Sequence, residues 1–209
     1  MARTELRKAF DRQVETLLAK GYAELAGIAP DLFRQGLAPL RERLSELPSS
    51  TDGARLPFVI AVHRDAVRAG RSMPLVELAG RPGLVRMDPT DPGEFAPIEG
   101  VHLPLGPAYL LADLDTGADT LNVTPDGALE RLLEEGRSPL TIEEGVAVLT
   151  HYPDVLETHN SFSLLGSRRG DRRVPALWRS NGHPRLGWCW AGNPHTWLGS
   201  ASCAARLGS

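Results

Sequence analysis

The chain has 209 residues, 42% of them hydrophobic and 23% charged, with a formal net charge of −3 at pH 7. This composition allows one hydrophobic core without disulfide or metal support, and the slightly acidic balance argues against nucleic acid as a partner. No stretch approaches the roughly 18 apolar residues of a membrane span, and the charged N-terminus lacks the apolar region of a secretory signal. We therefore expect a cytoplasmic protein that does not bind membranes, with Cys189 and Cys203 both reduced.

The N-terminal part of the sequence predicts a helical hairpin. Apolar residues recur at helical spacing in two stretches, the second of which begins at Pro30. Residues 48–53 are rich in Pro, Ser and Gly and predict a loop after the second helix. We therefore assign residues 1–48 to an N-terminal helical hairpin and residues 54–209 to an α+β core that includes the C-terminal segment.

The next part of the chain changes from helical to strand periodicity. Residues 56–62 and 108–114 are short apolar runs that predict buried strands. Weaker strands are expected at 75–78 and 84–87. Residues 88–107 hold many prolines and glycines, so they are expected to be mostly loop.

Two further helices have clear start signals. Thr124 precedes Pro125 as an N-cap, and Thr141 with Glu144 has the spacing of a capping box. The chain then returns to short strands and turns. The strands are expected at residues 162–165, 174–178 and 185–190. Together these elements predict a single α+β domain, in which the helical hairpin precedes a mixed sheet with packed helices.

Residues 114–119 read Leu-Asp-Thr-Gly-Ala-Asp and resemble the active-site turn of retroviral-type aspartic proteases. In those proteases the Asp shares one proton with its symmetry mate, because two close carboxylates cannot both ionise. The proteases are nearly all strand between this motif and a later apolar-apolar-Gly motif, for which residues 164–166 would stand here. This chain instead has two predicted helices in between. A tight turn capped by Asp115, with Gly117 at positive φ, is the simpler interpretation.

Other chemical motifs are missing from the sequence. Asp113, Asp115 and Asp119 have the hard oxygen ligands of a divalent cation site, but no Glu closes an EF-hand loop. The sequence has no phosphate-binding loop, no nucleophile elbow, no HExxH and no paired CxxC. We therefore predict no cofactor and no metal.

The last fifty residues have the most unusual composition. They hold all four tryptophans, both cysteines and seven arginines against one aspartate. Aromatic side chains on constrained loops often line ligand pockets, and arginines clamp carboxylate, sulfate or phosphate groups. We therefore predict a pocket for a small anionic ligand. Its binding residues are Arg168, Arg172, Arg173, Trp188, Trp190 and His195.

Two functions of different classes remain open at this point. In the first, the chain is a small-molecule-binding protein or an enzyme of specialised metabolism, with Asp113, Asp115 and His195 as candidate catalytic residues. Its pocket would then lie between the aromatic tail and the strand end that bears the two aspartates. In the second, the basic aromatic tail docks on a protein partner or on a second copy in a homo-oligomer. Convergence on one concave surface favours the first function, and a flat, exposed tryptophan patch favours the second.

Several stretches of the chain carry a resemblance to a known family. They are residues 10–14, 20–22, 121–125, 163–168, 170–178 and the tail LGWCWAGNPHTWLGSASC at 186–203. In these stretches the chain resembles an actinobacterial domain of unknown function, which implies an actinobacterial origin but assigns no role to any residue. The chain is also similar to small actinobacterial proteins that act with a partner subunit in aziridine ring closure. That chemistry requires an anion clamp for a leaving sulfate and a carboxylate that accepts the proton of the amine.

Overall fold

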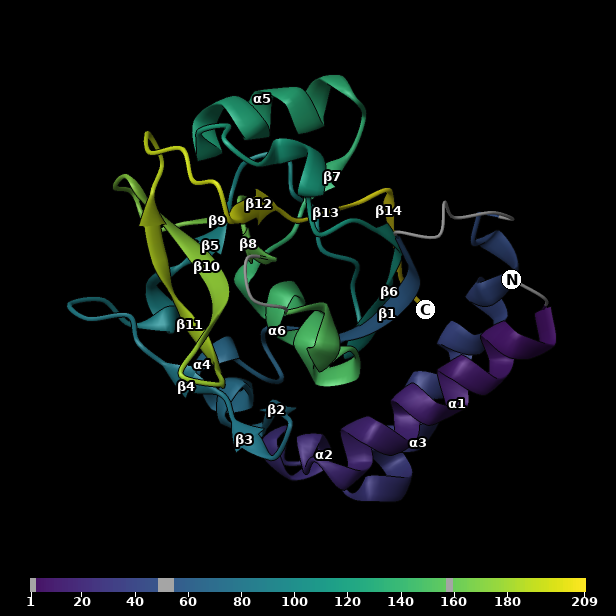
Figure 1. The fold of residues 1–209 in the computed structure, drawn as a ribbon. Helices are drawn as coiled ribbons and strands as arrows, with labels where there is room; N and C mark the ends of the chain where they lie inside the picture. Colours follow the sequence, from purple (N-terminus) through teal and green to yellow (C-terminus); the bar gives the residue numbers. More distant parts are fainter. Residues whose placement is uncertain (1–2, 49–54, 157–159) are drawn as a thin grey trace.

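The computed structural model describes residues 3–48, 55–156 and 160–209. At its centre lies helix α6 (Ile142–His151), between strands β1 and β6 on one side and β10 and β11 on the other (Figure 1). Every residue from Ile142 to Thr150 is buried. Neighbouring elements therefore cover this helix on all sides.

A three-stranded antiparallel sheet lies on one side of α6. Its order is β1-β6-β14, formed by β1 (Leu56–Val62), β6 (Ala108–Leu114) and β14 (Ala205–Leu207). The predicted strands at 56–62 and 108–114 are confirmed with these bounds. Both faces of β1 are covered, because Val59 packs in a hydrophobic cluster with α6 while Phe58 packs with the N-terminal helices. Burial on both faces explains why these strands are continuous apolar runs rather than alternating ones.

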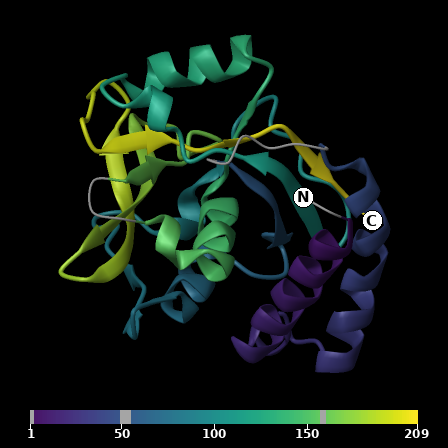
Figure 2. The ribbon, with the colours of Figure 1, turned by 45° about the vertical axis from the view of Figure 1, so that its right-hand side comes forward.

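The N-terminal helices cover the other face of this sheet. They are α1 (Arg3–Ala19), α2 (Tyr22–Leu25), α3 (Pro30–Leu37) and the 3₁₀ helix η1 (Ala38–Glu46). Figure 2 shows α1 beside α3, with the three-stranded sheet behind them. The predicted second helix changes to 3₁₀ geometry after Leu37, where Pro39 lacks the amide that an α-helical hydrogen bond needs. The predicted loop at 49–53 lies outside the described residues.

A five-stranded mixed sheet lies on the other side of α6. Its order is β12-β8-β10-β11-β4. The strands are β4 (Leu84–Val85), β8 (Ser161–Ser163), β10 (Arg173–Ser180), β11 (His183–Trp190) and β12 (Leu198–Ser200). β8, β10 and β11 are antiparallel, whereas β12 and β4 join as parallel edge strands. Asn181 and Gly182, both with positive φ, close the β10–β11 hairpin in the geometry that suits a two-residue turn.

Short elements connect the two sheets. Three two-stranded ladders pair β2 (Glu77–Leu78) with β3 (Arg81–Pro82), β5 (Ala96–Pro97) with β9 (Ser167–Arg168), and β7 (Ser138–Pro139) with β13 (Ser202–Cys203). The short helices are α4 (Ala69–Ser72), η2 (Met73–Leu75), η3 (Pro92–Glu94), η4 (Ala118–Thr120) and η5 (Pro153–Val155). Within the predicted loop at 88–107, only η3 and β5 are regular.

Helix α5 (Pro125–Glu134) covers one end of the five-stranded sheet, where Ala128 and Leu132 pack with Val174 of β10. The predicted start signals are confirmed for both helices. The Thr124 hydroxyl accepts a hydrogen bond from the Gly127 amide, and the Thr141 capping box is complete. The predicted α+β class is therefore correct. In the described part of the chain, no helix is long and apolar enough to cross a lipid bilayer.

Candidate functional site

The β10–β11 hairpin has two faces that differ in chemistry. Successive side chains of a strand point to opposite faces, and cross-strand partners share a face. The register therefore places Trp178 and Cys189 on the face that α5 covers at one end. By the same register, Arg173, Trp188 and Trp190 lie on the opposite face.

A pocket of about 230 Å³ lies on the Trp178 face, between the hairpin and residues 191–197. We call it the tryptophan pocket. It is lined by Ala176, Trp178, Trp188, Cys189, Trp190, Asn193, His195, Trp197 and Leu198. The strand register places the side chains of Trp188 and Trp190 on the opposite face, so the aromatic lining residues left for this face are Trp178, His195 and Trp197. The volume is below the roughly 300–1,000 Å³ of sites for drug-sized ligands, so the pocket suits one planar ring system.

Gly187 determines how the Trp178 indole lies in this pocket. A Cβ at Gly187 would be 2.2 Å from Cη2 and 2.7 Å from Cζ3 of Trp178. It would also lie 2.7 Å from the Arg86 carbonyl oxygen. The indole therefore rests directly on the backbone of β11, a close approach that only glycine permits.

The segment that covers the pocket is tied to its surroundings through main-chain hydrogen bonds. The Asp126 amide donates to the Ala191 carbonyl at 3.1 Å, and the Asn122 amide donates to the His195 carbonyl at 2.9 Å. At its far end, the Ser161 amide donates to the Trp197 carbonyl at 3.2 Å. These bonds hold the His195 and Trp197 rings over the cavity, with their centroids 5.4 Å apart.

The two groups in this pocket that could react are not paired with each other. Burial raises the pKa of the Cys189 thiol to about 12, despite the opposing charge of Arg168, so Cys189 is a neutral thiol. Nε2 of His195 is buried and has no hydrogen-bond partner in the described part of the chain. A Cys–His nucleophile of the kind used in covalent catalysis is therefore not assembled here.

On the opposite face, the predicted ligand residues form a packed stack. The Arg173 guanidinium lies 4.7 Å from the ring centroid of Trp188 and 5.0 Å from that of Trp190. It also forms an ion pair of 2.6 Å with Asp171. The Trp188 indole donates to the Met87 carbonyl at 3.2 Å. The Arg173 guanidinium and the two indoles thus pack against one another, while the Trp190 side chain remains 42% exposed.

The other predicted arginines lie apart from the pocket. Arg168 donates to the Leu165 carbonyl at 2.9 Å and lies 4.0 Å from the Asp126 carboxylate, and burial lowers its pKa. Arg172 is exposed and lies against Gly192. No arginine lines the tryptophan pocket, so Arg168, Arg172 and Arg173 form no anion clamp within it.

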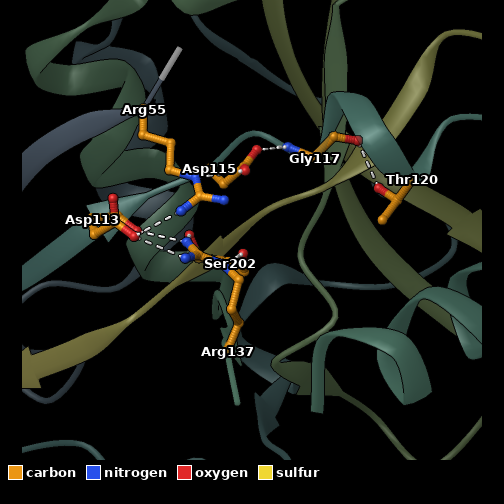
Figure 3. A network of polar contacts seen from close by, with 7 residues as sticks. All are labelled: Arg55, Asp113, Asp115, Gly117, Thr120, Arg137 and Ser202. Carbon is orange, nitrogen blue, oxygen red and sulfur yellow. Dashed lines mark hydrogen bonds and ion pairs between the residues drawn. The ribbon is translucent and has the colours of Figure 1, made fainter. Parts of the chain in front are cut away.

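The two candidate aspartates lie elsewhere, at the end of β6 (Figure 3). Asp113 accepts hydrogen bonds from Arg137 at 2.9 Å and from Arg55 at 3.2 Å. Asp115 accepts from the same Arg55 at 3.2 Å and from the Gly117 amide at 2.7 Å. Asp115 lines a polar pocket of about 250 Å³ that shares no residue with the tryptophan pocket. The structure therefore does not join His195 to the aspartates in one cavity.

The Asp-Thr-Gly turn has a clear structural use. Asp115 and Ser202 exchange two backbone hydrogen bonds of 2.9 Å. Gly117 has a φ of 85°, and a Cβ there would lie 2.3 Å from the Ser200 backbone. The turn thus takes the form that the simpler interpretation predicts, and α5 and α6 follow it in an α+β fold rather than in the nearly all-strand fold of the proteases. Within residues 3–48, 55–156 and 160–209, no three His, Cys, Asp or Glu side chains gather as a metal site.

Sequence reasoning missed three residues that shape the tryptophan pocket: Trp178, Gly187 and Trp197. Trp178 and Gly187 lie on neighbouring strands at diagonal positions of the same face. The hairpin turn at Asn181 and Gly182 was the signal that could have found them, since it sets the register that brings the indole onto the glycine.

These features define an α+β protein in which two sheets enclose a buried helix and one hairpin face carries an aromatic pocket. The chain belongs to a family of unknown function, DUF5701, whose model matches residues 16–209. The match includes the whole C-terminal segment and confirms the predicted resemblance at the level of the family. Comparison with curated proteins and with solved structures gave no match.

Proposed function

We propose that this protein binds a small molecule by taking a planar ring of the ligand into the tryptophan pocket. The observation that carries the proposal is that Trp178, His195 and Trp197 surround a cavity and each keep part of their surface exposed. Aromatic pairs with centroids about 4.5–7 Å apart gain roughly 0.5–1.5 kcal/mol beyond area burial. A ligand ring inserted among Trp178, His195 and Trp197 would form such an aromatic pair with each of these side chains.

Binding fits the geometry better than catalysis does. General acid–base chemistry needs its groups within hydrogen-bond reach of one reacting atom. Here Asp113 and Asp115 are held by arginines beside a different pocket, and Cys189 is a neutral thiol. The similarity to aziridine-forming proteins gains no support either, since the candidate carboxylates and the predicted arginine clamp do not meet in one cavity.

The test uses indole, a neutral planar probe. Isothermal titration or ligand-observed NMR should show saturable binding to the full chain at one site. Trp178→Leu and Trp197→Leu are each expected to weaken binding at least tenfold. Leu105→Ala is the control, because this exposed side chain lies outside the lining of the pocket, and the variant should bind like the wild type. Absence of saturable binding at millimolar indole, or equal losses in all three variants, would contradict the proposal.

A second candidate function rests on the Trp190 surface. Trp190 is 42% exposed beside the Arg173 stack, and exposed Trp–Arg pairs are typical of interface hot spots. We propose a second copy of the chain as the partner. Sedimentation equilibrium should then show concentration-dependent dimers that Trp190→Ser abolishes. A monomer at all concentrations would exclude this function.

A further inference from the structure

Two arginines outside the set that the sequence predicts lie beside Trp178 and Gly187, although neither lines the tryptophan pocket. Arg185 is the cross-strand partner of Trp178, so their Cβ atoms share a face at a separation of about 4.5–5.5 Å. Arg86 follows β4, which runs parallel to β11, and its amide donates to the Leu186 carbonyl at 2.7 Å. This places Arg86 beside Gly187, on which the indole rests.

Neither of these guanidiniums has a carboxylate partner in the described part of the chain. The arginines at 137, 169, 173 and 206 do have one. Nε of Arg185 is buried without a hydrogen-bond partner among the described residues, and Arg86 makes only a long 3.4 Å bond to the Val85 carbonyl.

The pocket itself does not neutralise these charges. Its lining contains no Asp and no Glu. Electrostatic attraction is stronger beside an apolar, aromatic wall than in bulk water. The fold therefore leaves uncompensated positive charge next to a cavity that otherwise suits a flat, weakly polar ring.

We propose that the ligand of the tryptophan pocket is a planar ring compound that carries an anionic group, and that Arg185 binds this group with Arg86 beside it. The inference rests on the proposed function and adds the charge of the ligand. The group is a carboxylate, sulfate or phosphate, because a guanidinium presents a planar pair of donors that matches their oxygens. A cationic substituent on the same ring would be repelled.

The experiment compares three probes that share one ring: indole, indole-3-acetate and tryptamine. For the wild type, indole-3-acetate should bind roughly tenfold more tightly than indole, and tryptamine should bind more weakly than indole. In Arg185→Gln the preference for the acetate should disappear while the affinity for indole stays the same. Arg179→Gln is the control, since it removes an equal charge from the same hairpin on the opposite face and should keep the preference.

The possible results separate this inference from the proposed function. If indole binds but the acetate is not preferred, or if the preference survives in Arg185→Gln, the inference fails and the pocket function stands. If none of the three probes binds, both fail. A further readout needs no variant: the wild-type preference should shrink as sodium chloride is raised, and a preference independent of salt also overturns the inference.

Discussion

Glu144 and Arg206 form a buried ion pair between α6 and the last strand. The Glu144 carboxylate is fully buried and accepts from Arg206 at 2.6 and 2.8 Å and from the Tyr109 hydroxyl at 2.9 Å. Burial, and then the charge of Glu144, raise the pKa of Tyr109, so it stays a hydrogen-bond donor. Burial alone would lower the pKa of Arg206, but Glu144 raises it overall. Arg206 therefore compensates the buried charge of Glu144, and Tyr109 donates a hydrogen bond to the same carboxylate.

Removing one partner of this pair should be costly. Arg206→Met leaves the Glu144 charge buried and unpaired, for which we expect a loss of about 3–5 kcal/mol in the free energy of unfolding. Urea denaturation measures it. Lys8→Met breaks the exposed pair with Glu5 and is the control, with little expected change. Equal small effects in both variants would contradict the structural role of the pair.

Glu143, its neighbour, is buried without a hydrogen-bond partner for either oxygen in the described part of the chain. Burial raises its pKa above the ordinary 4.5, although Arg64 and Arg68 oppose this. The folded state thus holds the proton more tightly, and ionised Glu143 costs stability as the pH rises above 4.5. Thermal melts should show the stability of Glu143→Gln, relative to wild type, increasing between about pH 4 and pH 7. Exposed Glu134→Gln should show no such trend, and a difference independent of pH would refute the argument.

At the scale of single elements, the β10–β11 hairpin depends on one glycine. Gly187→Ala places a methyl group against the Trp178 ring and the Arg86 carbonyl. Overpacking of this kind costs about 1–3 kcal/mol, and the displaced indole should also abolish indole binding. Denaturation and titration measure the two effects. Gly36→Ala in α3 is the control, because its nearest neighbour is Pro107 at 3.6 Å and alanine favours a helix. Wild-type stability and binding in Gly187→Ala would contradict this prediction.

Helix α6 is joined to β1 through a histidine. A His151 ring nitrogen lies 3.1 Å from the Ile60 carbonyl, and burial lowers the pKa of His151 to about 4. The unfolded chain takes up this proton near pH 6.5, whereas the folded chain resists it until about pH 4. Stability should therefore fall as the pH drops between these values, by up to about 1.4 kcal/mol per pH unit.

Replacement of this histidine tests the pH dependence. Unfolding of His151→Gln, followed at several pH values, should show a flatter decline below pH 6.5 than the wild type. Exposed His102→Gln should retain the wild-type slope. If the slope is unchanged in His151→Gln, another group is responsible.

At the scale of the whole molecule, the three-stranded sheet joins two hydrophobic clusters. Phe58, Ile60 and Leu110 pack with the N-terminal helices, and Val59 and Leu111 pack with α6. Because both clusters share β1 and β6, we propose that residues 1–48 do not fold independently of the rest.

Two spectroscopic probes report on opposite ends of the chain. Tryptophan fluorescence follows the C-terminal part, which holds all four indoles, and circular dichroism follows the helices, including the N-terminal ones. The two thermal transitions should coincide. Deletion of residues 1–48 should give an aggregating protein, because it exposes the apolar face of the sheet. Separate transitions, or a soluble folded deletion variant, would show that the helices form a unit of their own.

The sequence predicts those elements that are determined by residues close together in the chain. The apolar runs of β1 and β6, the Thr141 capping box and the Thr124 cap all lie within a few residues of sequence. Among the two- and three-residue strands, β2, β4 and β8 overlap predicted strands, but the others were not predicted. β14, for example, exists only because β6 offers it a partner. The sequence predicts a ligand site in the C-terminal segment, and the structure distributes the predicted residues over two faces of the β10–β11 hairpin and the loops beside it. Whether Trp178 or Trp188 faces a cavity depends on which hairpin face α5 covers, and that is decided by packing over long distances in sequence.

The anchored segment over the tryptophan pocket has a thermodynamic consequence for the proposed function. Its carbonyls at Ala191, His195 and Trp197 already accept hydrogen bonds, so the binding of the proposed ligand would order little additional chain. A binding site that is ordered before the ligand arrives loses little conformational entropy on binding. For the proposed function, this preorganisation would favour affinity, because little of the interaction free energy would be needed to order the chain.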